Sequence, residues 1–128
     1  MRRTTSRKAA RRQALYLLYQ WDLTGQELAS LYEGEPDEFA RVLAEAVSAR
    51  ADSLDLRITA ASPDWPADRL GTLERNILRI GVYELEEETV PREVAINEAV
   101  VLAKRYATED AARLVNGVLA QIAREEEA

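Results

Sequence analysis

Two residue types are missing from this chain of 128 residues, which contains no cysteine and no histidine. The lack of cysteine excludes disulfides and thiol nucleophiles, and together the two absences remove zinc sites built on these ligands and the usual general base near neutral pH. The sequence also has no glycine-rich cofactor loop. We therefore expect a non-catalytic protein with no metal and no cofactor.

Long apolar runs are absent as well. No stretch approaches the roughly 20 apolar residues that span a bilayer, and residues 1–12 lack the apolar core of a signal peptide. These absences predict a cytoplasmic protein without membrane contact.

Glycine and proline are scarce, at 5 and 4 residues, whereas 47% of the residues are hydrophobic and 31% are charged. This composition is typical of a globular protein, and we expect one domain over residues 1–128 with a single core. Apolar residues recur with a helical period along almost the whole chain, so the expected fold class is all-α. Capping and breaking residues place helices at about 6–23, 27–33, 37–60, 67–87, 92–107 and 109–126, with Gly71 able to kink the fourth.

Charge is distributed unevenly along the chain. The net charge is -6, yet six of the 17 basic residues and none of the 23 acidic residues lie in the first twelve positions. Because a phosphate chain senses the local potential within about 8 Å in physiological salt, this segment matters more than the sum. We expect a flexible basic arm at 1–5 and an acidic tail at 125–128.

The basic residues of the first helix are predicted to form one face. A helical wheel separates them from the apolar stripe and places Tyr19 and Leu15 beside them. Cations that hold phosphates next to a ring that stacks on an unpaired base are typical of single-stranded RNA binding. The alternative is a merely solvated face, with Tyr19 packed on another helix. If the face binds RNA, charge reversal at Arg7 and Arg11 should weaken binding without loss of helicity.

Several segments carry a more specific pattern. They are ALYLLYQW at 14–21, ERNILRIGVYEL at 74–85, VPREVAINEAV at 90–100 with LAKRY at 102–106, and LVNGVL at 114–119. In this order, behind an arginine-rich helix, they strongly resemble the NusB family of bacterial transcription antitermination factors over essentially the whole chain. The resemblance implies six to seven helices in two packed bundles and no catalytic activity. It also implies recognition of single-stranded boxA RNA of ribosomal RNA leaders, jointly with the ribosomal protein NusE, in an antitermination assembly on RNA polymerase.

The resemblance also assigns residues to these roles. Positions matching the RNA-binding surface are Arg2, Arg3, Arg7, Lys8, Arg11, Arg12, Tyr19, Asp110, Arg113 and Asn116. Positions matching the NusE-facing surface are Asp68 and Glu74. Asp110 also suits a helix N-terminus for purely structural reasons. The remaining motif residues are expected to serve folding, with Gly81 and Gly117 at close helix contacts and Tyr106 in the core.

Two other functions stay open on the sequence. NusB-like domains also assist RNA methyltransferases, and the acidic surface alone would suit a purely structural interaction protein. Whether the chain is a monomer or a homodimer is likewise undecided.

Overall fold

A computed structural model describes residues 6–127, and within them the chain is all-helical, as expected. The α-helices are α1 (Arg7–Thr24), α2 (Glu38–Ala49), α3 (Ala51–Ala61), α4 (Thr72–Glu87), α5 (Arg92–Tyr106) and α6 (Glu109–Glu127). Two short 3-10 helices, η1 (Leu28–Leu31) and η2 (Ala67–Arg69), lie in the connections. No helix among the described residues combines the length and apolarity that a membrane span requires.

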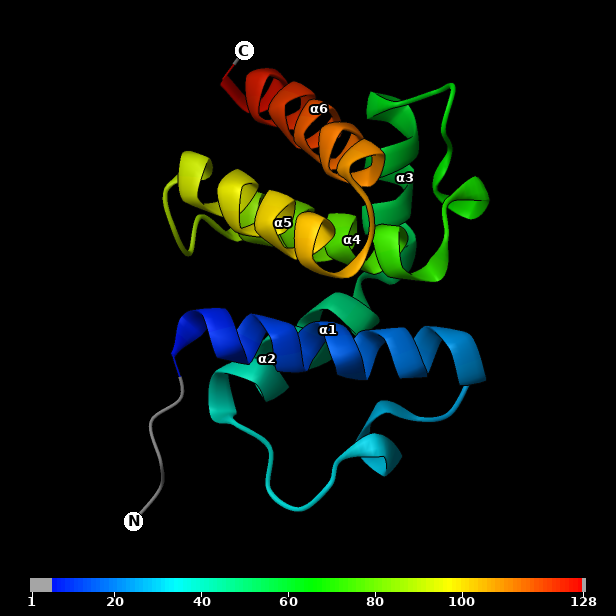
Figure 1. Cartoon of the computed structure of the whole chain (residues 1–128), viewed down its shortest axis with the longest axis vertical. Coiled ribbons are helices and arrows are strands. Elements are labelled where there is room, and N and C mark those ends of the chain that lie inside the picture. The colour runs from blue at the N-terminus through cyan, green and yellow to red at the C-terminus, as the bar shows by residue number, and fades with distance from the viewer. Residues whose placement is uncertain (1–5, 128) are drawn as a thin grey trace.

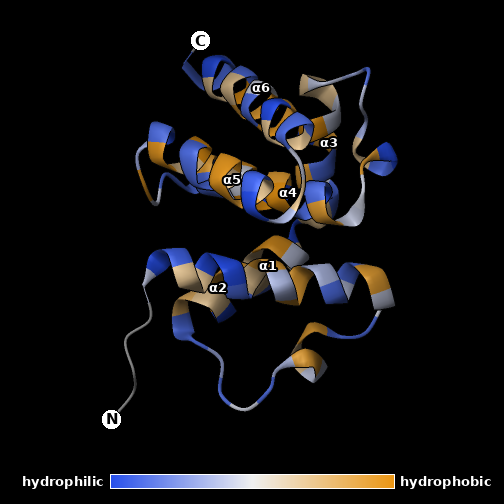
Figure 2. Ribbon diagram, in the orientation of Figure 1, coloured by the Kyte–Doolittle hydropathy of each residue, from blue (hydrophilic) through white to orange (hydrophobic). Residues whose placement is uncertain are grey.

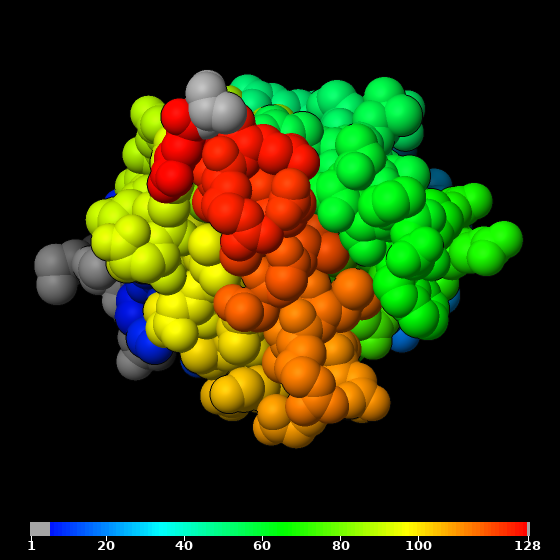
Figure 3. Space-filling model, turned by 90° about the horizontal axis from the view of Figure 1, so that it is seen from above, coloured from blue at the N-terminus to red at the C-terminus, as the bar shows by residue number. Residues whose placement is uncertain are grey.

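The helices form two layers (Figure 1). One layer holds α1, η1 and α2, and the other holds α3 to α6. The central element is α4, which packs against α1 on one side and against α3, α5 and α6 on the other. Figure 3 shows α6 lying across the top of the molecule between α5 and the segment from α3 to η2.

Local side chains explain where three helices begin. The backbone N–H of Ala9 donates to Ser6 Oγ at 3.1 Å, that of Ala40 to Asp37 Oδ2 at 3.0 Å, and that of Ala111 to Thr108 Oγ1 at 2.9 Å. Each bond satisfies an amide that lacks a partner inside its own helix. These caps fix the first residues of α1, α2 and α6.

The single helix expected over 37–60 is wrong, because the chain bends at Arg50 and forms α2 and α3. The two helices bury their apolar faces against different neighbours: α2 packs mainly on α1, while α3 packs on α4 and α6. No proline or glycine marks the bend, and the helical period of the apolar residues continues across it. The sequence pattern therefore predicts one helix where the structure has two. By contrast, the expected interruption at Gly71 is confirmed, since Gly71 separates η2 from α4.

Every α-helix contributes buried apolar residues to the core, and Figure 2 shows hydrophobic positions in each of them. Gly81 permits the closest approach: a Cβ there would lie 2.6 Å from Leu119 Cδ1 on α6, so its expected role at a helix contact is confirmed. The same expectation for Gly117 is wrong, because this residue is exposed and a Cβ would meet nothing within 4 Å.

The acidic C-terminal residues are part of α6 as far as Glu127. Arg57 on α3 donates to Glu126 at 3.1 Å, and Arg92 on α5 donates to Glu127 at 2.9 Å. The expected acidic tail is therefore the last turn of a helix over 125–127, while Ala128 lies outside the described residues.

Candidate nucleic-acid interface

The basic residues of α1 lie in four different environments. The Arg7 guanidinium stacks 4.1 Å from the ring centroid of Phe39 on α2, and Lys8 Nζ lies 3.3 Å from Glu98 Oε1 on α5. Arg12 is half-buried at the edge of a groove. Arg2 and Arg3 lie outside the described residues.

Arg11 does not belong to the exposed face, and the expectation that it points away from the core is wrong. Only 3% of the residue is exposed. Its Nε and Nη2 donate to Glu84 Oε1 and Oε2 on α4, both at 2.8 Å. The hydrogen bond with Glu84 is the main cause that raises the pKa of Arg11 above its ordinary value. Arg11 thus ties α1 to α4 and presents no donor to a phosphate.

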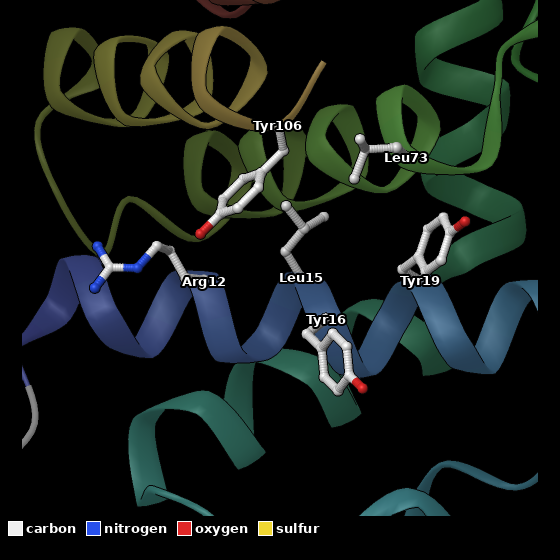
Figure 4. A pocket seen from close by; sticks show the side chains of 6 residues that line it. All are labelled: Arg12, Leu15, Tyr16, Tyr19, Leu73 and Tyr106. Atoms are coloured by element: carbon white, nitrogen blue, oxygen red, sulfur yellow. The ribbon is translucent and has the colours of Figure 1, made fainter.

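An open groove, which we call the tyrosine groove, runs between α1, α4 and α5. It has a volume of about 360 Å³. Its lining is formed by Arg12, Leu15, Tyr16, Tyr19, Leu73 and Tyr106. Figure 4 shows Tyr106 reaching from α5 toward α1 with its hydroxyl on the side of Arg12, while Leu15 and Tyr19 point from α1 toward α4. The groove therefore offers aromatic faces on an apolar floor with a cation at one end.

Two residues of the groove differ from expectation. Tyr106, expected in the core, is 43% exposed. Leu15, expected beside the cations on the surface, is buried and forms the floor of the groove. A helical wheel of α1 alone does not show that α4 and α5 cover this side of the helix.

Further cations lie beside Tyr106 at the C-terminal end of α5. Lys104 and Arg105 occupy its last turn and are exposed, and the Arg105 guanidinium lies 5.5 Å from the ring centroid of Tyr106. Sequence reasoning did not select them as binding residues, although the run Lys104-Arg105-Tyr106 repeats the pairing of cations and ring that drew attention to α1. They extend the basic surface beyond the first helix.

A second groove, of about 450 Å³, joins residues that the sequence assigned to different partners. It is lined by Trp65, Arg69, Leu70, Gly71, Glu74, Asp110, Ala111 and Leu114. Glu74 was matched to the NusE-facing surface and Asp110 to the RNA-binding surface, yet both lie here. Trp65, which is 57% exposed, was not selected from the sequence.

The other expected site residues are dispersed around this groove. Asp110 is exposed and forms an ion pair with Arg113, one turn further along α6. Asn116 is exposed on the same helix. Asp68 is exposed but lines a third groove, together with Asp52 and Asp55 of α3. Within residues 6–127, no three acidic residues are placed to hold a metal ion.

A polar network fixes the other end of α1 on α4. Asp22 Oδ2 accepts from Arg75 Nη2 at 2.9 Å, from Asn76 Nδ2 at 3.0 Å and from Arg79 Nη1 at 3.0 Å, and Arg79 Nη2 also donates to Asp55 Oδ2 at 2.6 Å. Burial alone would raise the pKa of Asp22, but the bonds from Arg75 and Asn76 and the charge of Arg79 outweigh it, and this pKa lies below its ordinary value. With the Arg11–Glu84 pair, this network anchors α1 at both ends of the tyrosine groove.

Comparison with known proteins identifies the family. Residues 8–124 match the model of the NusB family. The transcription antitermination protein NusB of Rubrobacter xylanophilus is 40% identical over 121 residues, which cover 89% of this chain and 87% of that protein. NusB of Myxococcus xanthus is 36% identical, covering 92% of this chain and 94% of its own.

Solved structures show the same fold. A NusB from T. maritima superposes with a TM-score of 0.85 at 32% identity, over 96% of this chain and 94% of its own. A chain from a complex of antitermination factors NusB and NusE with dsRNA gives a TM-score of 0.80 at 32% identity, over 93% and 96%. The match to a family of antitermination factors agrees with the expectation of a non-catalytic protein. On these matches, this chain belongs to the NusB family of transcription antitermination proteins.

Proposed function

We propose that this protein binds single-stranded boxA RNA of ribosomal RNA leader transcripts together with NusE, and that the complex nucleates an antitermination assembly on RNA polymerase. The observation that carries the RNA part is the tyrosine groove, with Arg12 at one end and Lys104 and Arg105 beside Tyr106. The solved complex of NusB and NusE with dsRNA supports NusE and RNA as partners, and the single-stranded form of the RNA is proposed from the groove alone. Since bacterial transcription takes place in the cytoplasm, the proposal locates the protein there.

The groove suits an unpaired base better than a duplex. A base that stacks on an aromatic ring gains about 1–3 kcal/mol whatever its identity, while neighbouring cations hold the phosphates on either side. Tyr19 and Tyr106 supply rings from two helices, and their separation is set by the packing of α1 and α5 on α4. We therefore assign base stacking to these tyrosines and phosphate contacts to Arg12, Lys104 and Arg105.

Arg2, Arg3 and Arg7 remain proposed phosphate contacts, Lys8 is a contact restricted by its ion pair with Glu98, and Arg11 is withdrawn because its guanidinium is enclosed with Glu84. For single-stranded RNA, the logarithm of affinity falls with that of salt by about 0.7 per phosphate contact. With Arg12, Lys104 and Arg105, the proposed contacts apart from Lys8 number six and predict a slope of about -4.

The groove that holds Glu74 and Asp110 is proposed to serve the boundary between RNA and NusE. Asp110, Arg113 and Asn116 follow one another along the exposed side of α6, where they are assigned to RNA, and Glu74 lies across the groove on α4. Asp68, which lines the third groove with Asp52 and Asp55, is assigned to the NusE-facing surface. A composite site of this kind gains affinity because the second contact becomes intramolecular once the first has formed.

Fluorescence anisotropy with labelled boxA RNA tests the proposal. We expect weak binding by the protein alone, clearly tighter binding with NusE, and a lower affinity for a scrambled RNA. Equal affinity for both RNAs, with and without NusE, would refute specific recognition.

Matched tyrosine variants test the groove itself. Tyr19→Ala and Tyr106→Ala should each weaken boxA binding by about 1–3 kcal/mol with little change in salt slope, because stacking releases no counterion. Tyr19→Phe and Tyr106→Phe keep the ring and should bind within about twofold of the unchanged protein. Alanine variants that bind normally would remove the tyrosines from the interface.

A further inference from the structure

Glu98 on α5 is an acidic residue placed directly against the basic helix. Its side chain is only 13% exposed, and its Oε1 lies 3.3 Å from Lys8 Nζ. Its charge also acts on Arg11, one turn further along α1. None of the roles assigned above uses Glu98, although it belongs to the family motif.

Two acids of the second layer thus face two of the cations of α1, but with different consequences. The pair of Arg11 and Glu84 is closed, since 4% and 2% of the two side chains are exposed. The pair of Lys8 and Glu98 is open on one side, since 64% of the Lys8 side chain is exposed. An RNA phosphate can approach Lys8, but there it meets a carboxylate that already holds the ammonium group.

A carboxylate at this position opposes phosphate binding in two ways. A phosphate that bonds to Lys8 must replace the ion pair with Glu98, and it must also come close to the negative charge of a side chain that is too enclosed to turn away. Because 64% of the Lys8 side chain is exposed, solvent screens this pair and its contribution to folding is small. Its larger effect falls on whatever anion approaches Lys8.

We propose that Glu98 is an internal competitor for RNA phosphate at Lys8, which lowers the affinity of the basic face for every RNA backbone. This inference rests on the proposed function. Phosphate contacts carry no sequence information, so the competitor weakens cognate and unrelated RNA by the same factor. With the phosphate contribution lowered, contacts that depend on the bases make up a larger share of the total affinity.

Glu98→Gln tests the inference because it removes the charge and keeps the shape. Anisotropy is measured with boxA RNA and with a scrambled single-stranded RNA over a series of salt concentrations. One additional phosphate contact at Lys8 should steepen the salt slope by about 0.7, which corresponds to about fivefold tighter binding near 0.1 M salt. We expect this gain for both RNAs alike.

Two control variants separate the local effect from net charge. Glu93→Gln on the same helix changes the net charge equally, but Glu93 forms no ion pair within residues 6–127, so its effect should be less than twofold. The double variant Lys8→Gln/Glu98→Gln removes both charges and should bind both RNAs as the unchanged protein does. Glu98→Asp, which withdraws the carboxylate from Lys8, should give a smaller gain and serves if the glutamine variant folds poorly.

Three results would overturn the inference: an unchanged slope in Glu98→Gln, weaker binding, which would make Glu98 a positioning residue for Lys8, or an equal gain in Glu93→Gln. Failure of the proposed function would look different. In that case the unchanged protein would not distinguish boxA from scrambled RNA, while the Glu98 variants would still show whether the carboxylate competes with phosphate.

Discussion

Replacing Arg11 by methionine should destabilise the fold severely, although Arg11 lies in a run of surface cations in the sequence. The substitution would leave the Glu84 carboxylate, whose side chain is 2% exposed, buried without its partner. Breaking a buried ion pair from one side typically lowers the free energy of unfolding by about 3–5 kcal/mol. For a domain of this length, that corresponds to a fall in Tm of roughly 10–20 °C.

Thermal and urea unfolding followed by circular dichroism would measure the effect. The double variant Arg11→Met/Glu84→Leu removes both charges at once and should recover most or all of the lost stability, because apolar residues of similar volume often replace a buried pair without loss. Arg12→Met is the control, since Arg12 is a half-buried neighbour that forms no ion pair within residues 6–127, and should change stability by less than about 0.5 kcal/mol. A loss below about 1 kcal/mol in Arg11→Met would refute the structural role assigned to this pair.

Four further substitutions test the packing, the Asp22 network and a helix end by urea or thermal unfolding. Gly81→Ala should lower the free energy of unfolding by about 1–3 kcal/mol, because its Cβ would overlap the buried Leu119 side chain. Gly117→Ala, on an exposed helical surface, should raise this free energy by about 0.5–1 kcal/mol. The reverse order would contradict the packing of α4 on α6. Since the pKa of Asp22 is depressed in the folded state, its stabilising effect is present above about pH 4 and is lost as the pH falls through the folded-state pKa. Asp22→Asn should therefore flatten the acid loss of stability, and an unchanged pH profile would count against the network. Glu88, the residue that follows α4, has a φ of 52°. Glu88→Gly should therefore raise the Tm by relieving about 1 kcal/mol of backbone strain, and a lower Tm would contradict this.

Helical periodicity was sufficient to predict the fold class and most helices, because apolar side chains recur wherever a helix packs on the core. It failed at Arg50, where the chain turns from one packing partner to another without a glycine or proline. That bend is determined by which surfaces α2 and α3 cover, and a single sequence contains no direct record of those surfaces.

The candidate site was predicted only in part, for a related reason. A wheel of α1 shows which residues share a side of that helix, but not that Glu84 and Glu98 face it from other helices. The first acid withdraws Arg11 into the interior, and the second pairs with Lys8. Tyr106 was missed because an aromatic residue at the end of a helix is more often buried, whereas here it lies over a groove.

The central claim, that RNA binds along α1 and the end of α5, is tested most directly by amide chemical-shift mapping of the labelled protein with NusE and boxA RNA. RNA should shift the signals of Arg12, Tyr19 and residues 104–106 most strongly, with smaller shifts at the start of α6. Those signals should move much less in a Tyr19→Ala/Tyr106→Ala variant. RNA-dependent shifts confined to α2 and α3, with α1 unaffected, would contradict it.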